Sequence, residues 1–289
     1  MTSRWLLVAM ATLLLAGCAS GFQNTLAQDR TWSAYRVCQA EIGSNMVIQR
    51  VDADGRWYGV CSDRCTRDTE FKSCMSEEIR AYLEESTLRQ RATTSATALS
   101  TSQGRTAITG PVAKPEWKVG SEWAYRSESR LGSRAFLWRL DRIENLANEP
   151  HYVIRDGSRE IFYRVADRGY TKEIFYGRTV REISPPAAWK LVSFPLQVGL
   201  SWDMKYVETR PTEQQTRTIE RRCVAEAEEA LTVPAGTFAT IRIVCRNSRT
   251  GAWVSTQWYS PEVTQMVKEE SALRTGERTS RELLMFRLK

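Results

Sequence analysis

The segment CVAEAEEALTVPAGTFATIRIVC, residues 223–245, sets the architecture of the larger part of this chain. A proline and a glycine mark a turn near its centre, and apolar and polar side chains alternate on either side. Cys223 and Cys245 lie eleven residues before and after Pro234, so they face each other in a simple antiparallel pair. We therefore predict a β-hairpin closed by a Cys223–Cys245 disulfide, which stabilises the fold by about 3 kcal/mol in the chain-entropy model. A bulge near Glu228 and Glu229 is the feature that would shift this register.

Residues 116–289 around this hairpin are rich in short segments of β-branched and aromatic residues, separated by turn signals such as Asp156-Gly157. No long helical period interrupts them. We predict a mainly β domain with an antiparallel curved sheet, in the form of an open barrel or half-barrel. Examples of these segments are 123–127, 135–143, 151–154, 160–165, 170–176, 202–207, 217–224, 240–246, 253–259 and 283–288.

Residues 22–91 predict a small α+β module with four cysteines. A helix is expected from about Asp29 to Ile42, ending at Gly43, followed by a hairpin with its turn at residues 52–55 and a second helix after Asp68. Cys38 and Cys74 fall on the apolar faces of the two helices. A Cys38–Cys74 bridge is natural, which leaves Cys61 to pair with Cys65, although four cysteines allow three pairings.

A segment rich in Ser and Thr, residues 92–115, separates the two parts. It has no apolar period, and it closes with Gly110-Pro111 and Pro115. This composition is typical of a flexible linker.

The chain begins with a short basic segment and an uninterrupted apolar run of eleven residues from Leu6 to Ala16, which is typical of a secretory signal peptide. A helix that spans a bilayer needs about 20 residues. The run ends in Leu15-Ala16-Gly17-Cys18, which resembles the lipobox of bacterial lipoproteins. The resemblance implies that residues 1–17 are removed, that Cys18 receives lipid, including palmitate, and that residues 18–21 form the lipidated N-terminus.

The same resemblance implies a location and a set of partners. The protein is expected to be anchored in a membrane by its lipid, after handling by the lipoprotein maturation and sorting machinery. Ala19 and Ser20 follow the cysteine, and the absence of Asp there resembles lipoproteins sorted to the outer membrane, facing the periplasm. The inner membrane is the alternative.

Composition and charge bear on two classes of partner, nucleic acid and metal ions. The formal charge is +7 and the isoelectric point is near 9.1, but the basic residues are scattered and the protein is exported, so nucleic acid is not an expected partner. Lipidation of one of the seven cysteines leaves an even six, which favours disulfides over a metal site in an oxidising compartment. We expect no cofactor and no metal.

A second resemblance covers about the last 100 residues. The segments Val233-Pro-Ala-Gly-Thr-Phe238 and Trp258-Tyr-Ser-Pro-Glu-Val263 are similar to a pattern in uncharacterised β-rich proteins of the bacterial envelope. The pattern consists of turns and strand edges. It therefore implies a fold and a compartment, and it transfers no chemistry.

No catalytic residue can be assigned from the sequence. His151 is the only histidine and lies in an expected strand, and no Gly-x-Ser-x-Gly elbow is present. Glu226, Glu228 and Glu229 form one acidic cluster and Glu269-Glu270 another, and both are more simply explained as solvated strand edges. We therefore expect a protein that is not an enzyme.

Seven tryptophans in the β domain distinguish two non-enzymatic functions. As core filler they indicate a binding or scaffold module for an unknown envelope protein, with a filled interior and an exposed apolar patch. As the lining of a cavity they indicate a carrier of lipid or lipoprotein, an analogy at the level of the fold alone. An enzyme acting on the cell wall or polysaccharide would instead need a cleft with converging carboxylates. The tryptophans are residues 117, 123, 138, 189, 202, 253 and 258.

Overall fold

The structure is a computed structural model that describes residues 24–61, 67–83, 107–129, 132–272 and 276–289. The expected signal peptide, Cys18 and Cys65 lie outside these residues. None of the described helices is long and apolar enough to cross a bilayer.

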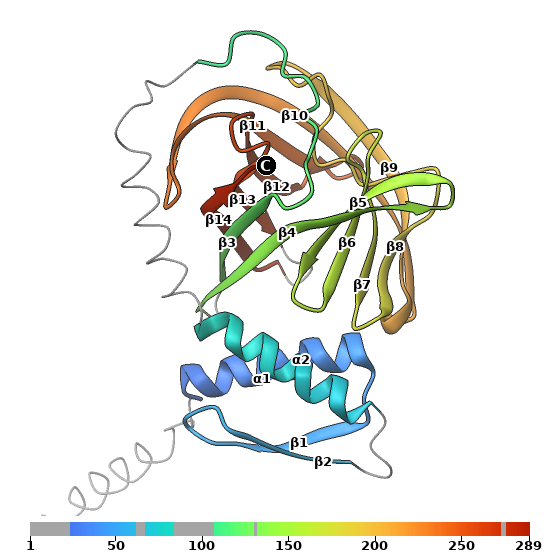
Figure 1. Cartoon of the computed structure of the whole chain (residues 1–289), viewed down its shortest axis with the longest axis vertical. Helices are drawn as coiled ribbons and strands as arrows, with labels where there is room; N and C mark the ends of the chain where they lie inside the picture. The colour runs from blue at the N-terminus through green and yellow to red at the C-terminus, as the bar shows by residue number, and fades with distance from the viewer. Residues whose placement is uncertain (1–23, 62–66, 84–106, 130–131, 273–275) are drawn as a thin grey trace, which may run out of the picture.

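The β domain is a closed antiparallel barrel, in which strands that follow one another in the chain are neighbours (Figure 1). The mainly β class, with a small α+β module before it, is confirmed. The sheet closes into a complete barrel, whereas the sequence predicted an open barrel or half-barrel, because strand segments alone do not show whether the first and last strands pair. The sheet closes where β14 pairs with β3, and where β8 pairs with β9 through only two residue pairs, Glu182 with Thr209 and Ile183 with Glu208. The strands are β3 (Glu122–Ser129), β4 (Gly132–Leu146), β5 (Glu149–Asp156), β6 (Arg159–Arg164), β7 (Tyr170–Phe175), β8 (Arg178–Ile183), β9 (Ser201–Arg210), β10 (Gln215–Val233), β11 (Gly236–Asn247), β12 (Trp253–Ser260), β13 (Gln265–Ala272) and β14 (Arg278–Arg287).

The β10–β11 hairpin contains both a two-residue turn and a bulge. Val233 pairs with Gly236 across the turn, so the hairpin is centred between Pro234 and Ala235. That register alone would misalign the two cysteines by one residue. An extra residue between Ala225 and Ala227 corrects it, so Cys223 lies opposite Cys245 and the two form a disulfide.

The N-terminal module packs helices α1 (Leu26–Ile42) and α2 (Asp68–Leu83) against a hairpin of β1 (Met46–Val51) and β2 (Trp57–Cys61). A capping box at Thr25 begins α1, and Gly43 ends it at φ 66°, a conformation that glycine adopts without strain. The Cys38–Cys74 disulfide joins the two helices, and both cysteines are fully buried. Cys61 also forms a disulfide, and its expected partner, Cys65, lies outside the described residues.

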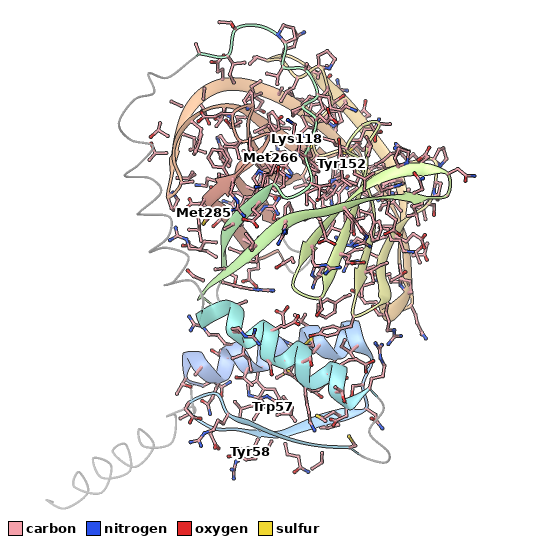
Figure 2. The ribbon with its side chains drawn as sticks, in the orientation of Figure 1. Trp57, Tyr58, Lys118, Tyr152, Met266 and Met285 are labelled. Carbon is pink, nitrogen blue, oxygen red and sulfur yellow. A yellow bond between two sulfur atoms is a disulfide. The ribbon has the colours of Figure 1, made fainter. Side chains whose placement is uncertain are left out.

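The side chains of the β1–β2 hairpin divide between its two faces (Figure 2). Trp57 points toward the helices, where its ring contacts Phe71 edge-on at 6.1 Å between centroids. Tyr58 points away from them, on the same outer face as the directly paired Val47 and Val60. These three side chains are 45–50% exposed and form a small apolar patch.

Residues 107–118 lie across the mouth of the barrel farthest from the helices (Figure 1), and we call this segment the strap. Val112 forms a β-bridge with Leu196, and Lys114 donates hydrogen bonds to the carbonyl oxygens of Val165 and Ala166. Trp117 is buried in the core of the barrel. Residues 107–115, which the sequence assigns to a flexible linker, are therefore held on the barrel, because their few apolar side chains find partners there.

Candidate functional site

Inward-facing side chains, many of them aromatic, form a large buried cluster inside the barrel. Some of their polar atoms donate to carbonyl oxygens at or beside strand ends. Trp123 Nε1 donates to the oxygen of Val263 at 2.9 Å, and the Tyr125 hydroxyl donates to the oxygen of Met266 at 2.9 Å. Tyr152 and Met266, labelled in Figure 2, belong to the same buried cluster. A barrel packed in this way differs from one that encloses an apolar ligand.

One ion pair lies among these aromatic rings. Arg281 on β14 contacts Glu269 on β13 at 2.7 Å, and its guanidinium lies 4.7 Å from the centroid of the Trp138 ring and 5.2 Å from that of Tyr125. Burial lowers the pKa of Arg281, but Glu269 more than offsets this and holds the pKa above its ordinary value. Glu269 and Glu270, adjacent in the sequence, therefore have different partners. Glu269 pairs inside the sheet with Arg281, and Glu270 contacts Lys268 at 3.2 Å.

A second group of charges lies at the end of the barrel nearest the helices. Glu173 on β7 is 7% exposed, and it contacts Arg159, Arg181 and the hydroxyl of Tyr170. Burial would raise the pKa of Glu173, but Arg159 and Arg181 outweigh it and hold that pKa below its usual range. Glu208 on β9 is shared in the same way by Arg210, Arg217 and Arg181. Both carboxylates are therefore ionised and each is held by several arginines.

Replacing Glu173 with glutamine should lower the free energy of unfolding at pH 7 by about 3 kcal/mol, because it leaves two largely buried guanidinium groups without their carboxylate. The pKa of Glu173 is lower in the folded protein than in the unfolded chain. Its stabilising contribution is therefore complete above about pH 4.3, and it is lost as the pH falls through the folded pKa. Urea unfolding of both proteins at pH 7 and at pH 3.5 should show a large difference that shrinks in acid. Glu182→Gln, at an exposed position on the next strand, is the control. Equal stabilities at pH 7 would refute the role of this carboxylate.

The mouth under the strap contains an unusual buried cation. Arg168, in the β6–β7 turn, is 7% exposed, and its guanidinium lies 3.9 Å from the ring centroid of Trp117. Its Nη1 donates to the oxygen of Thr264 at 3.1 Å, and no carboxylate of the described residues pairs with it. Burial lowers the pKa of Arg168 to about 10. The residue thus joins the strap to the β12–β13 turn through cation–π and hydrogen-bond contacts.

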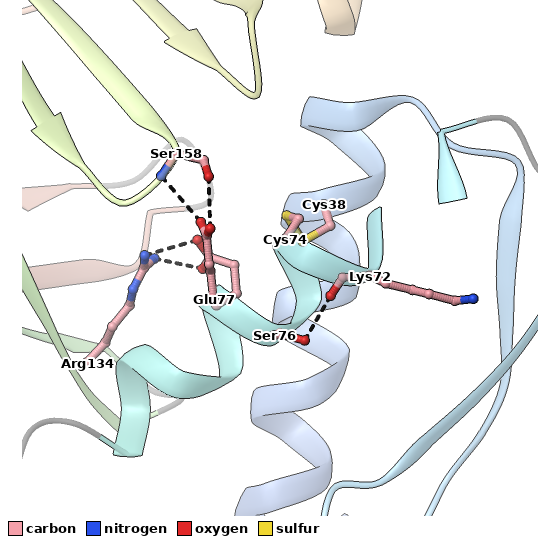
Figure 3. Close-up of a disulfide and its surroundings, with 8 residues drawn as sticks. Cys38, Lys72, Cys74, Ser76, Glu77, Arg134 and Ser158 are labelled. Atoms are coloured by element: carbon pink, nitrogen blue, oxygen red, sulfur yellow. Dashed lines mark hydrogen bonds and ion pairs between the residues drawn. A yellow bond between two sulfur atoms is a disulfide. The ribbon is translucent and has the colours of Figure 1, made fainter. Parts of the chain in front are cut away.

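The N-terminal module lies at the opposite end of the barrel (Figure 1), and Figure 3 shows part of the contact between them. Glu78 of α2 forms an ion pair with Arg134 of β4 at 2.8 Å, and Glu77 accepts a hydrogen bond from the Ser158 hydroxyl at 2.8 Å. Phe175 and Val180 of the barrel belong to the buried core of the module. The sequence suggested two units on a tether, and this shared core was not predictable from it.

The helix ends add further contacts to the same interface. The carbonyl oxygen of Ile42, at the end of α1, accepts hydrogen bonds from Arg67 and from Arg178 of β8. Arg67 also donates to the carbonyl oxygen of Tyr176 at 3.4 Å. Cationic side chains at the C-terminal end of a helix are favoured by its dipole, so these contacts stabilise both the helix and its docking.

The other residues weighed and set aside as catalytic candidates lie apart from one another. His151 is buried in β5, and its ring nitrogen contacts the oxygen of Glu149 at 2.9 Å. Of the first acidic cluster, Glu226 and Glu229 contact Arg242, each at 3.4 Å, and Glu228 accepts a hydrogen bond from the backbone of Ile108 in the strap. No group of metal ligands occurs among the described residues. The described residues therefore bring together none of the acid, base and metal arrangements weighed from the sequence.

Among known proteins, similarity to this chain is found in solved structures. No family model matches the sequence, and no curated protein matches it. The chain is similar to a protein described as a lipoprotein from Parabacteroides distasonis, with 13% identity and a TM-score of 0.31 over 62% of this chain and 100% of that chain. It is also similar to the Escherichia coli lipoprotein YmcC, with 9% identity and a TM-score of 0.37 over 60% and 92% of the two chains. An exported protein with a YmcC-like fold from Bacteroides fragilis has 11% identity and a TM-score of 0.35, over 62% of this chain and 100% of that chain. At identities of 9–13% these similarities transfer no site chemistry.

Proposed function

We propose that this protein is a membrane-anchored lipoprotein of the bacterial envelope, with its barrel acting as a non-enzymatic binding or scaffold module on the periplasmic side. The lipobox at Cys18 supports the anchor, with the outer membrane as the favoured site. The proposal places the N-terminal module next to the membrane. Only six residues separate Cys18 from Thr25, and the seven Cα–Cα steps between them span at most about 25 Å when fully extended.

The single observation that carries the scaffold function over the carrier function is the filled barrel. A carrier needs an apolar space large enough for an acyl chain. In this barrel, a cluster of buried side chains that includes Trp123 and Tyr259 lies in the interior. The strap lies across one mouth, and the module lies at the other. The apolar patch on the outer face of the β1–β2 hairpin is the kind of surface that the scaffold function requires.

Native mass spectrometry tests this proposal on the chain from Ala19 onward, exported to a bacterial periplasm without its lipid. We expect the bare protein mass, because the buried side chains of the barrel core occupy space that an acyl chain would need. Stoichiometric extra mass that leaves as a phospholipid or fatty acid would show that the barrel opens to hold lipid, and the carrier function would then replace the scaffold function.

A further inference from the structure

A pocket of about 290 Å³ lies in the seam between the N-terminal module and the barrel. Helix α1 forms one wall, with Arg36 and Val37. The ends of β6, β7, β8 and β9 form the rest, together with the short 3-10 helix η1 (Pro211–Glu213). The share of liquid volume occupied by one water is about 30 Å³, so the pocket has room for a polyatomic ion.

The side chains that line this pocket carry an excess of positive charge. Four guanidinium groups face two carboxylates in the pocket wall. Behind the wall, Glu208 contacts Arg217, and because their charges are opposite this pair does not change the positive excess. Both lining carboxylates already have arginine partners. Glu173 contacts Arg159 and Arg181, and Glu213 contacts Arg210 at 2.9 Å. The lining charged residues are Arg36, Arg159, Glu173, Arg181, Arg210 and Glu213.

Two features show hydrogen-bonding capacity that these carboxylates do not use. Arg36 is exposed, and no carboxylate of the described residues pairs with it. The Nε of Arg181 is buried without a hydrogen-bond partner, and its contact with Glu208 is long, at 3.9 Å. The exposed Arg36 guanidinium is therefore accessible to an anion in the pocket, and the buried Arg181 adds positive charge behind it.

We propose that this pocket binds a phosphate group, with Arg36 on the module side and Arg159, Arg181 and Arg210 on the barrel side. Arginine presents a planar fork of donors that matches phosphate oxygens, and three oxygens can engage guanidinium groups from different elements. A phosphate held there contacts both the module and the barrel, so it stabilises their docking. The chemistry fits either a free phosphate or a phospholipid headgroup. Binding of a phospholipid headgroup assumes the membrane anchor of the proposed function, whereas binding of a free phosphate does not.

Isothermal titration calorimetry of the mature chain at low salt tests the site with two probes, inorganic phosphate and dihexanoylphosphatidylglycerol below its micelle concentration. Arg36→Gln is the informative variant, because the side chain is exposed on a helix and glutamine has a similar helix propensity. We expect it to weaken binding at least fivefold. Arg56→Gln is the matched control. It removes the same charge from the exposed β1–β2 turn, where Arg56 contacts only Asp54 among the described acids, and it should leave binding unchanged.

Each outcome is decisive. Arg36-dependent binding of phosphate alone supports a free-anion site, and Arg36-dependent binding of the lipid supports a headgroup site. Failure of both probes to bind would overturn the proposal, as would equal weakening by Arg36→Gln and Arg56→Gln, because the effect would then reflect net charge alone. The scaffold proposal stands or falls separately, on the mass of the unlipidated protein.

Discussion

Replacing Cys18 with alanine should move nearly all of the protein from the membrane fraction to the soluble periplasmic fraction. The variant has no thiol to accept lipid. A single acyl chain gives only marginal membrane binding, with an association constant of about 10⁴ M⁻¹, whereas two or more chains hold a protein firmly. Losing all of the chains therefore removes several orders of magnitude of membrane affinity.

Fractionation after osmotic shock, with incorporation of labelled palmitate as a second readout, measures this effect. Ser20→Ala, two residues further along, is the control and should remain in the membrane fraction with its label. If the Cys18→Ala variant stays with the membranes after a carbonate wash, the anchor is not the lipid on this cysteine. The membrane contact would then have to come from the protein surface.

Replacing both Cys38 and Cys74 with alanine should destabilise the N-terminal module by about 4 kcal/mol in the chain-entropy model, since the disulfide closes a loop between residues separated by 36 positions. A module of this size buries little apolar surface of its own and is only marginally stable without such a bridge. We expect α1 and α2 to lose most of their protection from hydrogen exchange, while the barrel strands keep theirs.

The Cys223→Ala, Cys245→Ala variant provides the comparison. It removes a disulfide that joins two strands already paired along their length, so any loss of protection should spread through the barrel and spare the helices. Unchanged protection of both helices in the Cys38/Cys74 variant would mean that docking alone keeps the module folded. In that case Phe175 and Val180, which complete its core from the barrel, contribute more than the bridge does.

Local chemistry explains which parts of the fold were predictable. Gly43 ends α1 and the Pro-Ala-Gly turn reverses β10 into β11, because backbone preference acts over a few residues. Strands β8 and β13 are not among the segments that the sequence singles out as examples. Both carry several charged residues, and in β8 one of these, Arg181, lies in the ion-pair group with Glu173. A charged residue that pairs inside a barrel looks in the sequence like one that faces solvent.

The candidate site was less predictable than the fold, because it depends on contacts between distant parts of the chain. Arg36 and Arg210 line one pocket although they are far apart in the sequence, and Arg134 pairs with Glu78 across the module–barrel interface. No periodicity or spacing marks such pairs. The bulge beside Ala225 is an intermediate case: the sequence placed a register shift a few residues away, at Glu228 and Glu229.

The strap and the module lie at opposite mouths of the barrel. A mechanical force on the anchor would therefore reach the barrel through the module interface, whereas the backbone enters the barrel at the other mouth. A pull on an anchored Cys18 reaches the module first, at Thr25, where the side chain is hydrogen-bonded to Ala53 of the hairpin turn. The load then passes to the barrel through the contacts between module and barrel, such as the Glu78–Arg134 ion pair. The covalent connection enters the barrel only at the far mouth, through the strap. Under tension the noncovalent interface would yield first, and the barrel would remain attached by the backbone of the same chain.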